Sequence, residues 1–206
     1  DDILIASSSE EQHKADLRKV CRKLEENGLL IREEKCVFGK TDVEFLGHKV
    51  DSSGIRPLPE KVKAVKEYPI PKTPKELKRF LGVINYYHRF IPGAAAVMQP
   101  LHIVSSRKPA TQVIQWTREE RNSFERAKTL LANVTTLHHP TVDGPLILST
   151  DASDIGVGAV LEQWQNGSWV PLAFFSRHLN ARERKYSTFD RELLAGHLAV
   201  RHFCHA

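Results

Sequence analysis

Residues 73–92 read TPKELKRFLGVINYYHRFIP, and this stretch decides how the middle of the chain folds. Thr73 followed by Pro74 and Glu76 is typical of a helix start, because threonine can cap the first amides and proline suits the first turn. Apolar side chains then recur at helical spacing, at Leu77, Phe80, Leu81 and Ile84. The sequence therefore predicts an amphipathic helix whose basic residues lie away from its apolar stripe.

Basic residues concentrate around this helix. The 206-residue chain has a formal net charge of +5, whereas residues 56–90 alone hold nine Lys or Arg against three Glu. A surface with this charge suits a polyanion, because each neutralised phosphate releases a bound counterion. A solvated helix face has the same composition, so the charge pattern alone leaves both interpretations open.

Two aspartates open the chain, Asp1 and Asp2, directly before the apolar run Ile3-Leu4-Ile5-Ala6. This run is predicted to be a buried strand. Adjacent carboxylates beside such a strand can hold magnesium, which prefers oxygen ligands and bridges to substrate phosphates. An acidic pair at a chain end is more often simply exposed. The pair is therefore a candidate site only.

Between this run and the basic helix, the pattern predicts one helix, a hairpin and a second short helix. Ser9 is suited to cap the first helix, and Asn27-Gly28 is a typical helix stop. Apolar runs follow, with residues 43–50 predicted as the single return strand of the hairpin. A proline start then predicts the short helix over residues 59–68.

After Pro140 the pattern becomes that of a β-sheet. The last two predicted strands are joined by a turn at Asn166-Gly167. The strands are predicted at residues 146–150, 157–163 and 169–175. A helix is predicted over residues 187–202, and its leucines available for a core are Leu193, Leu194 and Leu198.

A second acidic candidate lies at the end of the first of these strands. Asp151 is followed by glycines that let the backbone turn into a hairpin, a familiar setting for a metal ligand. Glu192 lies in the last predicted helix among mostly apolar neighbours. Its carboxylate is therefore expected either at the rim of the core or directed at a cation.

Zinc binding, disulfides and membrane insertion are all disfavoured. The spacing of the histidines and cysteines does not match a zinc finger or a metalloprotease motif. No apolar run approaches the roughly 20 residues that a membrane span needs, and the N-terminus lacks a signal-peptide pattern. A reducing intracellular setting fits the three widely spaced cysteines, Cys21, Cys36 and Cys204.

Several motifs follow one another in a characteristic order. They are KCVF at 35–38, VEFLGHKV at 43–50, LGVINYYHRFIP at 81–92, TDASDIGVGAVL at 150–161 and FSR at 175–177. With Asp1-Asp2 before them and residues 186–195 after them, this order resembles the Pol polyprotein of gypsy-type LTR retrotransposons along essentially the whole chain. Any one motif is only suggestive, but the ordered set is very specific.

The resemblance implies an α+β fold that runs from a reverse-transcriptase palm into a ribonuclease H-like domain with a mixed sheet. The parts would be the end of the palm with the primer-grip hairpin at 1–57, a helical thumb at 58–104, a connecting segment at 105–140, and an incomplete ribonuclease H-like α/β domain at 141–206.

The resemblance also implies roles for individual residues. Asp1 and Asp2 would be catalytic metal ligands of the polymerase site, and Asp151 and Glu192 those of the ribonuclease H site, with Mg²⁺ or Mn²⁺ as cofactor. The primer end would be positioned by Phe45, Leu46, Gly47 and His48. The backbone of the template–primer duplex would be contacted by Lys75, Lys78, Arg79, Tyr86 and Arg89.

The implied parent protein copies RNA into DNA from deoxynucleotides and degrades the RNA strand of the RNA–DNA hybrid. It would work inside the cell, in a cytoplasmic virus-like particle or the nucleus. The isolated chain is expected to be inactive or very weak, because the remaining family acids are not within these residues. Two alternatives stay open: a catalytically dead remnant that binds nucleic acid, and a chain that aggregates through open sheet edges.

Overall fold

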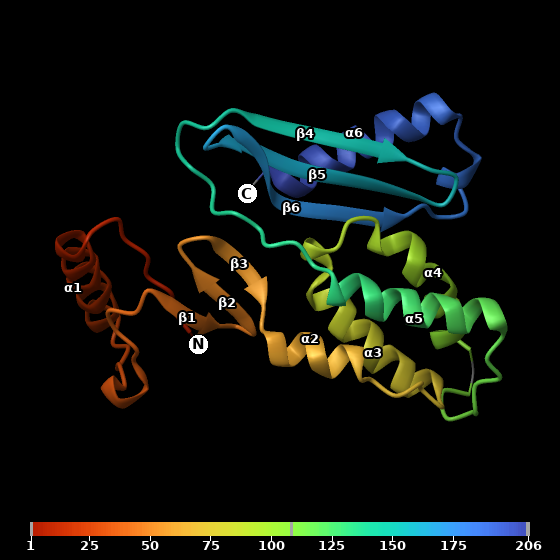
Figure 1. The fold of residues 1–206 in the computed structure, drawn as a ribbon, viewed down its shortest axis with the longest axis horizontal. Coiled ribbons are helices and arrows are strands. Elements are labelled where there is room, and N and C mark those ends of the chain that lie inside the picture. The colour runs from red at the N-terminus through yellow and green to blue at the C-terminus, as the bar shows by residue number, and fades with distance from the viewer. Residues whose placement is uncertain (1, 108, 205–206) are drawn as a thin grey trace.

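The computed structural model describes residues 2–107 and 109–204, and in them the chain forms two three-stranded sheets and six α-helices. Figure 1 shows three neighbouring layers: a small sheet with an outlying helix, a group of four helices, and a longer sheet backed by the last helix. The α+β fold class is therefore confirmed.

The small sheet is built from two consecutive tight hairpins. Its antiparallel strands are β1 (Asp42–Phe45), β2 (His48–Asp51) and β3 (Gly54–Pro57). The prediction of one strand over 43–50 is wrong, because the chain reverses at Leu46-Gly47. Both residues have positive φ, 45° and 71°, as a two-residue type I′ hairpin turn requires. The left-handed conformation costs Leu46 about 1 kcal/mol.

The N-terminal region agrees with the sequence only in part. Helix α1 (Glu10–Glu26) is confirmed, with the Ser9 side chain accepting from the Gln12 amide and the helix ending at Asn27. The predicted buried strand at Ile3–Ala6 is wrong, because the segment has no strand partner and Ile3 is 57% exposed. An apolar run becomes a strand only where a neighbouring strand can pair with it.

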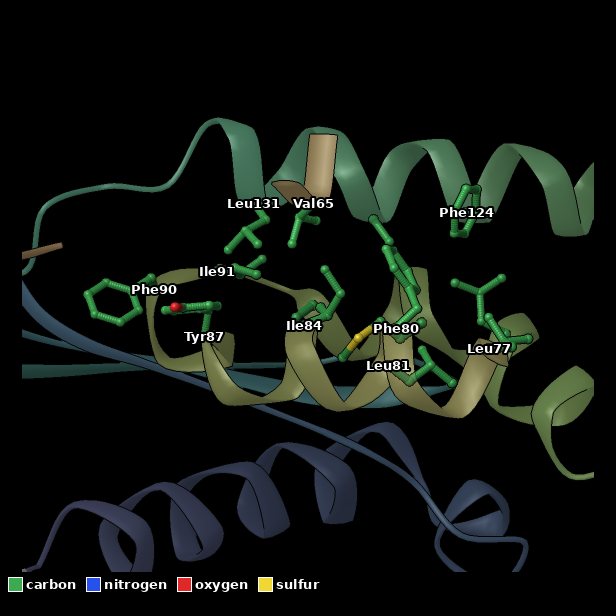
Figure 2. Packing of buried hydrophobic residues seen from close by; sticks show 14 of the residues in the cluster. Val65, Leu77, Phe80, Leu81, Ile84, Tyr87, Phe90, Ile91, Phe124 and Leu131 are labelled. Atoms are coloured by element: carbon green, nitrogen blue, oxygen red, sulfur yellow. The ribbon is translucent and has the colours of Figure 1, made fainter. Parts of the chain in front are cut away.

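Four helices form the main hydrophobic core, shown in Figure 2. They are α2 (Pro59–Lys66), α3 (Pro74–Tyr86), α4 (Ala94–Ser105) and α5 (Arg118–Ala132). Helix α3 begins as predicted, with the Thr73 hydroxyl accepting from the Glu76 amide. Its Phe80 ring meets Phe124 of α5 at a centroid distance of 4.6 Å. Helix α2 ends at Lys66, two residues before the predicted end.

The second sheet has the order β4-β5-β6 and lies against α6. Its elements are β4 (Leu146–Ala152), β5 (Gly156–Gln165), β6 (Ser168–His178) and α6 (Thr188–Phe203). The predicted turn is confirmed, with Asn166 and Gly167 at φ 50° and 85°. Every strand pair described is antiparallel, so the expectation of a mixed sheet is corrected: strands joined by short hairpins can pair only antiparallel.

The core of this second unit is small. Val157, Leu179 and Ala195 are its buried residues, with Leu194 and Leu198 packed against them. Leu193 was also expected in the core, but this is wrong, since the side chain is 65% exposed on the other side of α6. Within residues 2–107 and 109–204, none of the helices combines the length and the apolar character needed to cross a membrane.

A short extended segment, Leu137–His139, joins the two sheets; we call it the strap. Leu137 forms two backbone hydrogen bonds with Ile55 of β3, of 2.8 and 3.0 Å. The next amide, of His138, donates to the Pro171 carbonyl of β6 at 2.9 Å. Gly54 admits this contact, because a Cβ there would lie 2.1 Å from the Leu137 oxygen. The strap therefore holds β3 and β6 side by side.

Candidate nucleic-acid interface and acidic corner

One face of α3 is exposed and carries the basic residues. The opposite face buries Leu77, Phe80, Leu81 and Ile84 in the main core. The exposed side chains are those of Lys75, Lys78, Arg79, Val83, Asn85 and Tyr86. The salt bridges of the small sheet and α2 involve Lys49, Arg56 and Lys61 instead, and among the described residues no salt bridge involves a cation of α3. The cations of α3 are thus available to an external anion.

Gly82 lies in the middle of this face and is a site that sequence reasoning missed. A Cβ built on Gly82 would have nothing within 4 Å, so no packing requirement within the described residues explains the glycine. Glycine in a helix interior costs about 1 kcal/mol relative to alanine. That cost, at an exposed position between basic and aromatic residues, is the sequence signal that could have drawn attention to Gly82.

The C-terminal end of α3 holds the Leu46-Gly47 turn. The Tyr86 hydroxyl donates a hydrogen bond to the Leu46 carbonyl. The Tyr87 hydroxyl donates to the Gly47 carbonyl at 3.1 Å. Two consecutive tyrosines therefore bind the two consecutive carbonyls of one turn. The sequence predicted that Tyr86 contacts nucleic acid, and the structure adds this internal role for both tyrosines.

His48, next to the turn, packs among aromatic rings. Its ring lies 5.3 Å from those of Tyr86 and Phe90 and 5.4 Å from that of Tyr87, between centroids. Burial lowers the pKa of His48, and the charge of Arg89 adds to the effect. The imidazole packed in this setting supports the turn. Leu46, whose side chain is 55% exposed, forms the tip.

The residues predicted to contact the duplex backbone thus divide into two groups. Lys75, Lys78, Arg79 and Tyr86 share the exposed face of α3. Arg89 is exposed but lies beyond the helix, in the 3₁₀ turn His88–Phe90, with its guanidinium 5.7 Å from the Phe90 ring centre. This turn packs against β6. Arg89 therefore lies at the junction with the second sheet.

The acidic corner lies at the far end of the second sheet. Asp151, near the end of β4, is paired with Gly158 across the ladder, and α6 packs against β4. Arg191 of α6 forms an ion pair with Asp154 in the β4–β5 turn. This pair holds the start of α6 at the corner, so Glu192, the next residue, comes to the same end of the sheet as Asp151. Both carboxylates are exposed.

The other two acidic candidates are the first two residues of the sequence. Asp1 lies outside the described residues, and Asp2 is exposed at the start of the chain. Among residues 2–107 and 109–204, no group of three or more His, Cys, Asp or Glu is placed to hold a metal ion. Two of the predicted acids, Asp151 and Glu192, therefore lie on elements that meet at this corner, β4 and α6.

Family models match both ends of the chain. A model described as "Reverse transcriptase (RNA-dependent DNA polymerase)" matches residues 1–50, and one described as "RNase H-like domain found in reverse transcriptase" matches residues 116–206. The chain is 40% identical over 205 residues to the Retrovirus-related Pol polyprotein from transposon 297 of Drosophila melanogaster. It is 33% identical over 206 residues to the Transposon Tf2-3 polyprotein of Schizosaccharomyces pombe, a Ty3/gypsy-type element. These matches span 100% of this chain but only 19% and 15% of the relatives.

Solved structures share the fold. The chain superposes on the foamy viral protease-reverse transcriptase in complex with double-stranded DNA with a TM-score of 0.79, at 23% identity, over 96% of this chain and 34% of that one. The same protein in complex with an RNA/DNA hybrid gives a TM-score of 0.79 over 96% of this chain and 27% of that one. At this identity the likeness establishes the arrangement of the elements.

Proposed function

Since this chain belongs to the Pol polyproteins of gypsy-type LTR retrotransposons, spanning reverse-transcriptase and ribonuclease H-like regions, we propose that it holds a template–primer duplex or RNA–DNA hybrid during RNA-directed DNA synthesis. The parent protein would polymerise deoxynucleotides and cleave the RNA of the hybrid. Its relatives are transposon polyproteins, which supports action inside the cell, in a virus-like particle or the nucleus.

The observation that carries this proposal is the unbroken path from the basic start of α3 to the Leu46 tip. Lys75, Lys78 and Arg79 supply positive charge, Gly82 leaves the middle of the face bare, and Tyr86 leads to the turn. A phosphate backbone suits such a path, since cations contact phosphates and a bare glycine allows close approach. The path would position the duplex without reading its sequence.

The structural neighbours support a duplex partner. Their titles describe foamy viral protease-reverse transcriptase in complex with double-stranded DNA and with an RNA/DNA hybrid. The superposition covers 96% of this chain, so nearly all of its length shares the arrangement of that protein. We propose the same two ligand classes for the chain described here.

The acidic corner is the candidate for chemistry. Reverse transcriptase and ribonuclease H families generally depend on divalent metal ions. Asp151 and Glu192 fit such an ion in kind, because exposed carboxylate oxygens are the ligands that Mg²⁺ prefers. We propose that they hold Mg²⁺ or Mn²⁺ for RNA cleavage, and that Asp1 and Asp2 do so for polymerisation. When bound, the ion would activate the attacking water.

Salt-dependent binding of an RNA–DNA hybrid tests the path on α3. We expect Lys78→Ala with Arg79→Ala to weaken binding and to lower the slope of log K against log salt by about 1 to 2, because each phosphate contact contributes about 0.7 to 0.9. The matched control is Arg22→Ala with Lys23→Ala, an adjacent exposed basic pair on α1. Equal losses in both pairs would contradict a path on α3 and indicate a nonspecific charge effect.

Cleavage of the labelled hybrid with Mg²⁺ or Mn²⁺ tests the corner. Wild-type cleavage that Asp151→Asn abolishes would support the metal role. The alternative function is nucleic-acid binding without chemistry. It is favoured by the geometry of the acids, because among the described residues no group of three or more His, Cys, Asp or Glu is placed to hold a metal ion. Binding that depends on α3, with equal absence of cleavage in wild type and Asp151→Asn, would establish that alternative.

A further inference from the structure

We propose that Tyr86 and Tyr87 are positioning residues, whose hydroxyls fix the Leu46-Gly47 turn to the end of α3 so that the basic face and the Leu46 tip form one rigid surface. The inference rests on the proposed function, since it assigns the tip to the primer end. The two tyrosines would determine where that end lies without themselves taking part in chemistry.

The clamp is specific in its geometry. Tyr86 donates to the carbonyl of the first turn residue and Tyr87 to that of the second, each across 40 residues of sequence. Carbonyls of a two-residue turn otherwise point to solvent, so these hydroxyls are supplied by a distant element. The Leu58 amide also approaches the Gly47 carbonyl, at 3.4 Å. The turn is thus held from α3 and from the start of α2.

The turn has a conformational reason to need this support. Leu46 has a φ of 45°, a conformation that side-chain-bearing residues rarely adopt. Gly47 has a φ of 71° and a tight surrounding, because a Cβ there would lie 3.3 Å from the Tyr87 hydroxyl. A strained turn that is held by outside hydrogen bonds is typical of a functional site, where the surroundings maintain a conformation the local sequence disfavours.

The aromatic packing makes the clamp rigid. Tyr86 and Tyr87 meet edge to face at a centroid distance of 4.9 Å, and His48 lies against both rings. Tyr87 is buried, whereas the Tyr86 ring is half exposed. One ring therefore fixes the turn from inside while the other joins it to the exposed face. Movement of α3 would carry the Leu46 tip with it.

Hydrogen exchange of the turn tests the clamp without nucleic acid. We expect Tyr86→Phe and Tyr87→Phe each to accelerate exchange of the amides of residues 46–48 by about fivefold, and the double variant by more than tenfold, because each change removes one hydrogen bond. Tyr186→Phe, which removes a hydroxyl far from the turn, is the matched control and should change nothing. Unchanged exchange in the double variant overturns the proposal.

Cross-linking to the primer tests the positioning. The duplex carries a thiol tether on its 3′-terminal primer nucleotide, and the chain carries Leu46→Cys with Cys21, Cys36 and Cys204 replaced by Ser. We expect Tyr87→Phe, a change at a buried residue that lies outside the proposed path, to slow disulfide formation at least fivefold while the duplex Kd changes less than twofold. Equal cross-linking rates with and without the Tyr87 hydroxyl refute the positioning role.

The two proposals fail in different ways. A chain that does not bind the duplex at all contradicts the proposed function, and the assignment of the tip to the primer end falls with it. Faster exchange in the tyrosine variants would then still establish the clamp as a feature of the free protein. Binding that is normal while exchange is unchanged contradicts the clamp alone.

Discussion

The Ser176 hydroxyl of β6 accepts a hydrogen bond of 3.1 Å from the backbone amide of Ala95, at the start of α4. The N-cap of this helix is Gly93, which has no side chain to satisfy the first amides. A residue 81 positions away therefore supplies the cap. The contact ties the four-helix core to the second sheet, and it gives the first prediction.

We expect Ser176→Ala to lower the free energy of unfolding by about 1 kcal/mol, the usual effect of losing a helix N-cap. The measurement is urea denaturation followed by circular dichroism. Ser52→Ala, in the exposed turn between β2 and β3, is the control and should change stability by less than about 0.5 kcal/mol. Equal effects of the two changes would show that the Ala95 contact is dispensable.

Five histidines with a lowered pKa predict an acid-labile fold; His48, His88 and His178 are half-buried, whereas His102 and His202 are more exposed. Burial is the main cause that lowers the pKa of each from 6.5, in His48, His88, His102, His178 and His202. Below pH 6.5 the unfolded chain then binds more protons than the folded one, so stability falls as pH falls. Each half-buried histidine contributes at most about 1.4 kcal/mol per pH unit between its folded pKa and 6.5, and the exposed His102 and His202 contribute less because solvent screens their charge.

Denaturation midpoints at pH 7.5, 6.5 and 5.5 measure this effect. We expect little change between the first two values and a clear decrease at the third. His102→Gln with His178→Gln should reduce the decrease, because these two rings face each other at 6.3 Å between α4 and β6. The Asp51 carboxyl, whose pKa is lowered to about 2 by hydrogen bonds from Ser53, titrates well below this range. A midpoint that is constant down to pH 5.5 would contradict the prediction.

Substitutions at two helix glycines can distinguish an effect on fold stability from an effect on hybrid binding. Gly82 of α3 and Gly196 of α6 both have open space around the position of a Cβ. We expect Gly82→Ala and Gly196→Ala each to stabilise the fold by about 0.5 to 1 kcal/mol. Only Gly82→Ala should weaken hybrid binding, because only that methyl group would stand on the proposed path. Identical binding by both variants would place the duplex elsewhere.

The buried hydrogen bonds of Gln163 predict that a change of its amide to a carboxylate lowers the stability of the fold strongly. Gln163 is 2% exposed, accepts from the Thr141 amide at 2.8 Å, and donates to the carbonyls of Thr141 and Gly144 at 2.8 and 2.9 Å. We expect Gln163→Glu to destabilise the chain by about 2 to 4 kcal/mol, since a carboxylate cannot donate and faces two carbonyls. Gln115→Glu, at an exposed position, should be nearly neutral in the same denaturation assay.

Local signals in the sequence were sufficient for several elements. The Thr73 cap and the apolar stripe predicted α3, and the Asn166-Gly167 pair predicted the β5–β6 turn, because each is decided by neighbouring residues. The Leu46-Gly47 turn was missed for the opposite reason. Leucine is rarely found with positive φ, and the hydrogen bonds that hold it there come from α3.

The sequence predicted which residues belong to the candidate site, but it did not predict how they contact one another. The resemblance pointed to both the primer-grip segment and the thumb, and they meet through Tyr86 and Tyr87. That hydroxyls from one element satisfy carbonyls of the other could not be read from residue order. Gly82 was overlooked, because an exposed glycine becomes informative only once the space around it is known.

The strap sets the distance between the two sheets. Leu137 is hydrogen-bonded to β3 and His138 to β6. The sheet that carries the Leu46 tip and the sheet that carries the Asp151 corner are therefore held at a fixed distance from each other. Under the proposed function, a hybrid that contacts both sheets would extend over a constant number of base pairs between the Leu46 tip and the Asp151 corner, whatever its sequence. Gly54→Ala, which would place a Cβ against the Leu137 carbonyl, would loosen the strap and let that number vary.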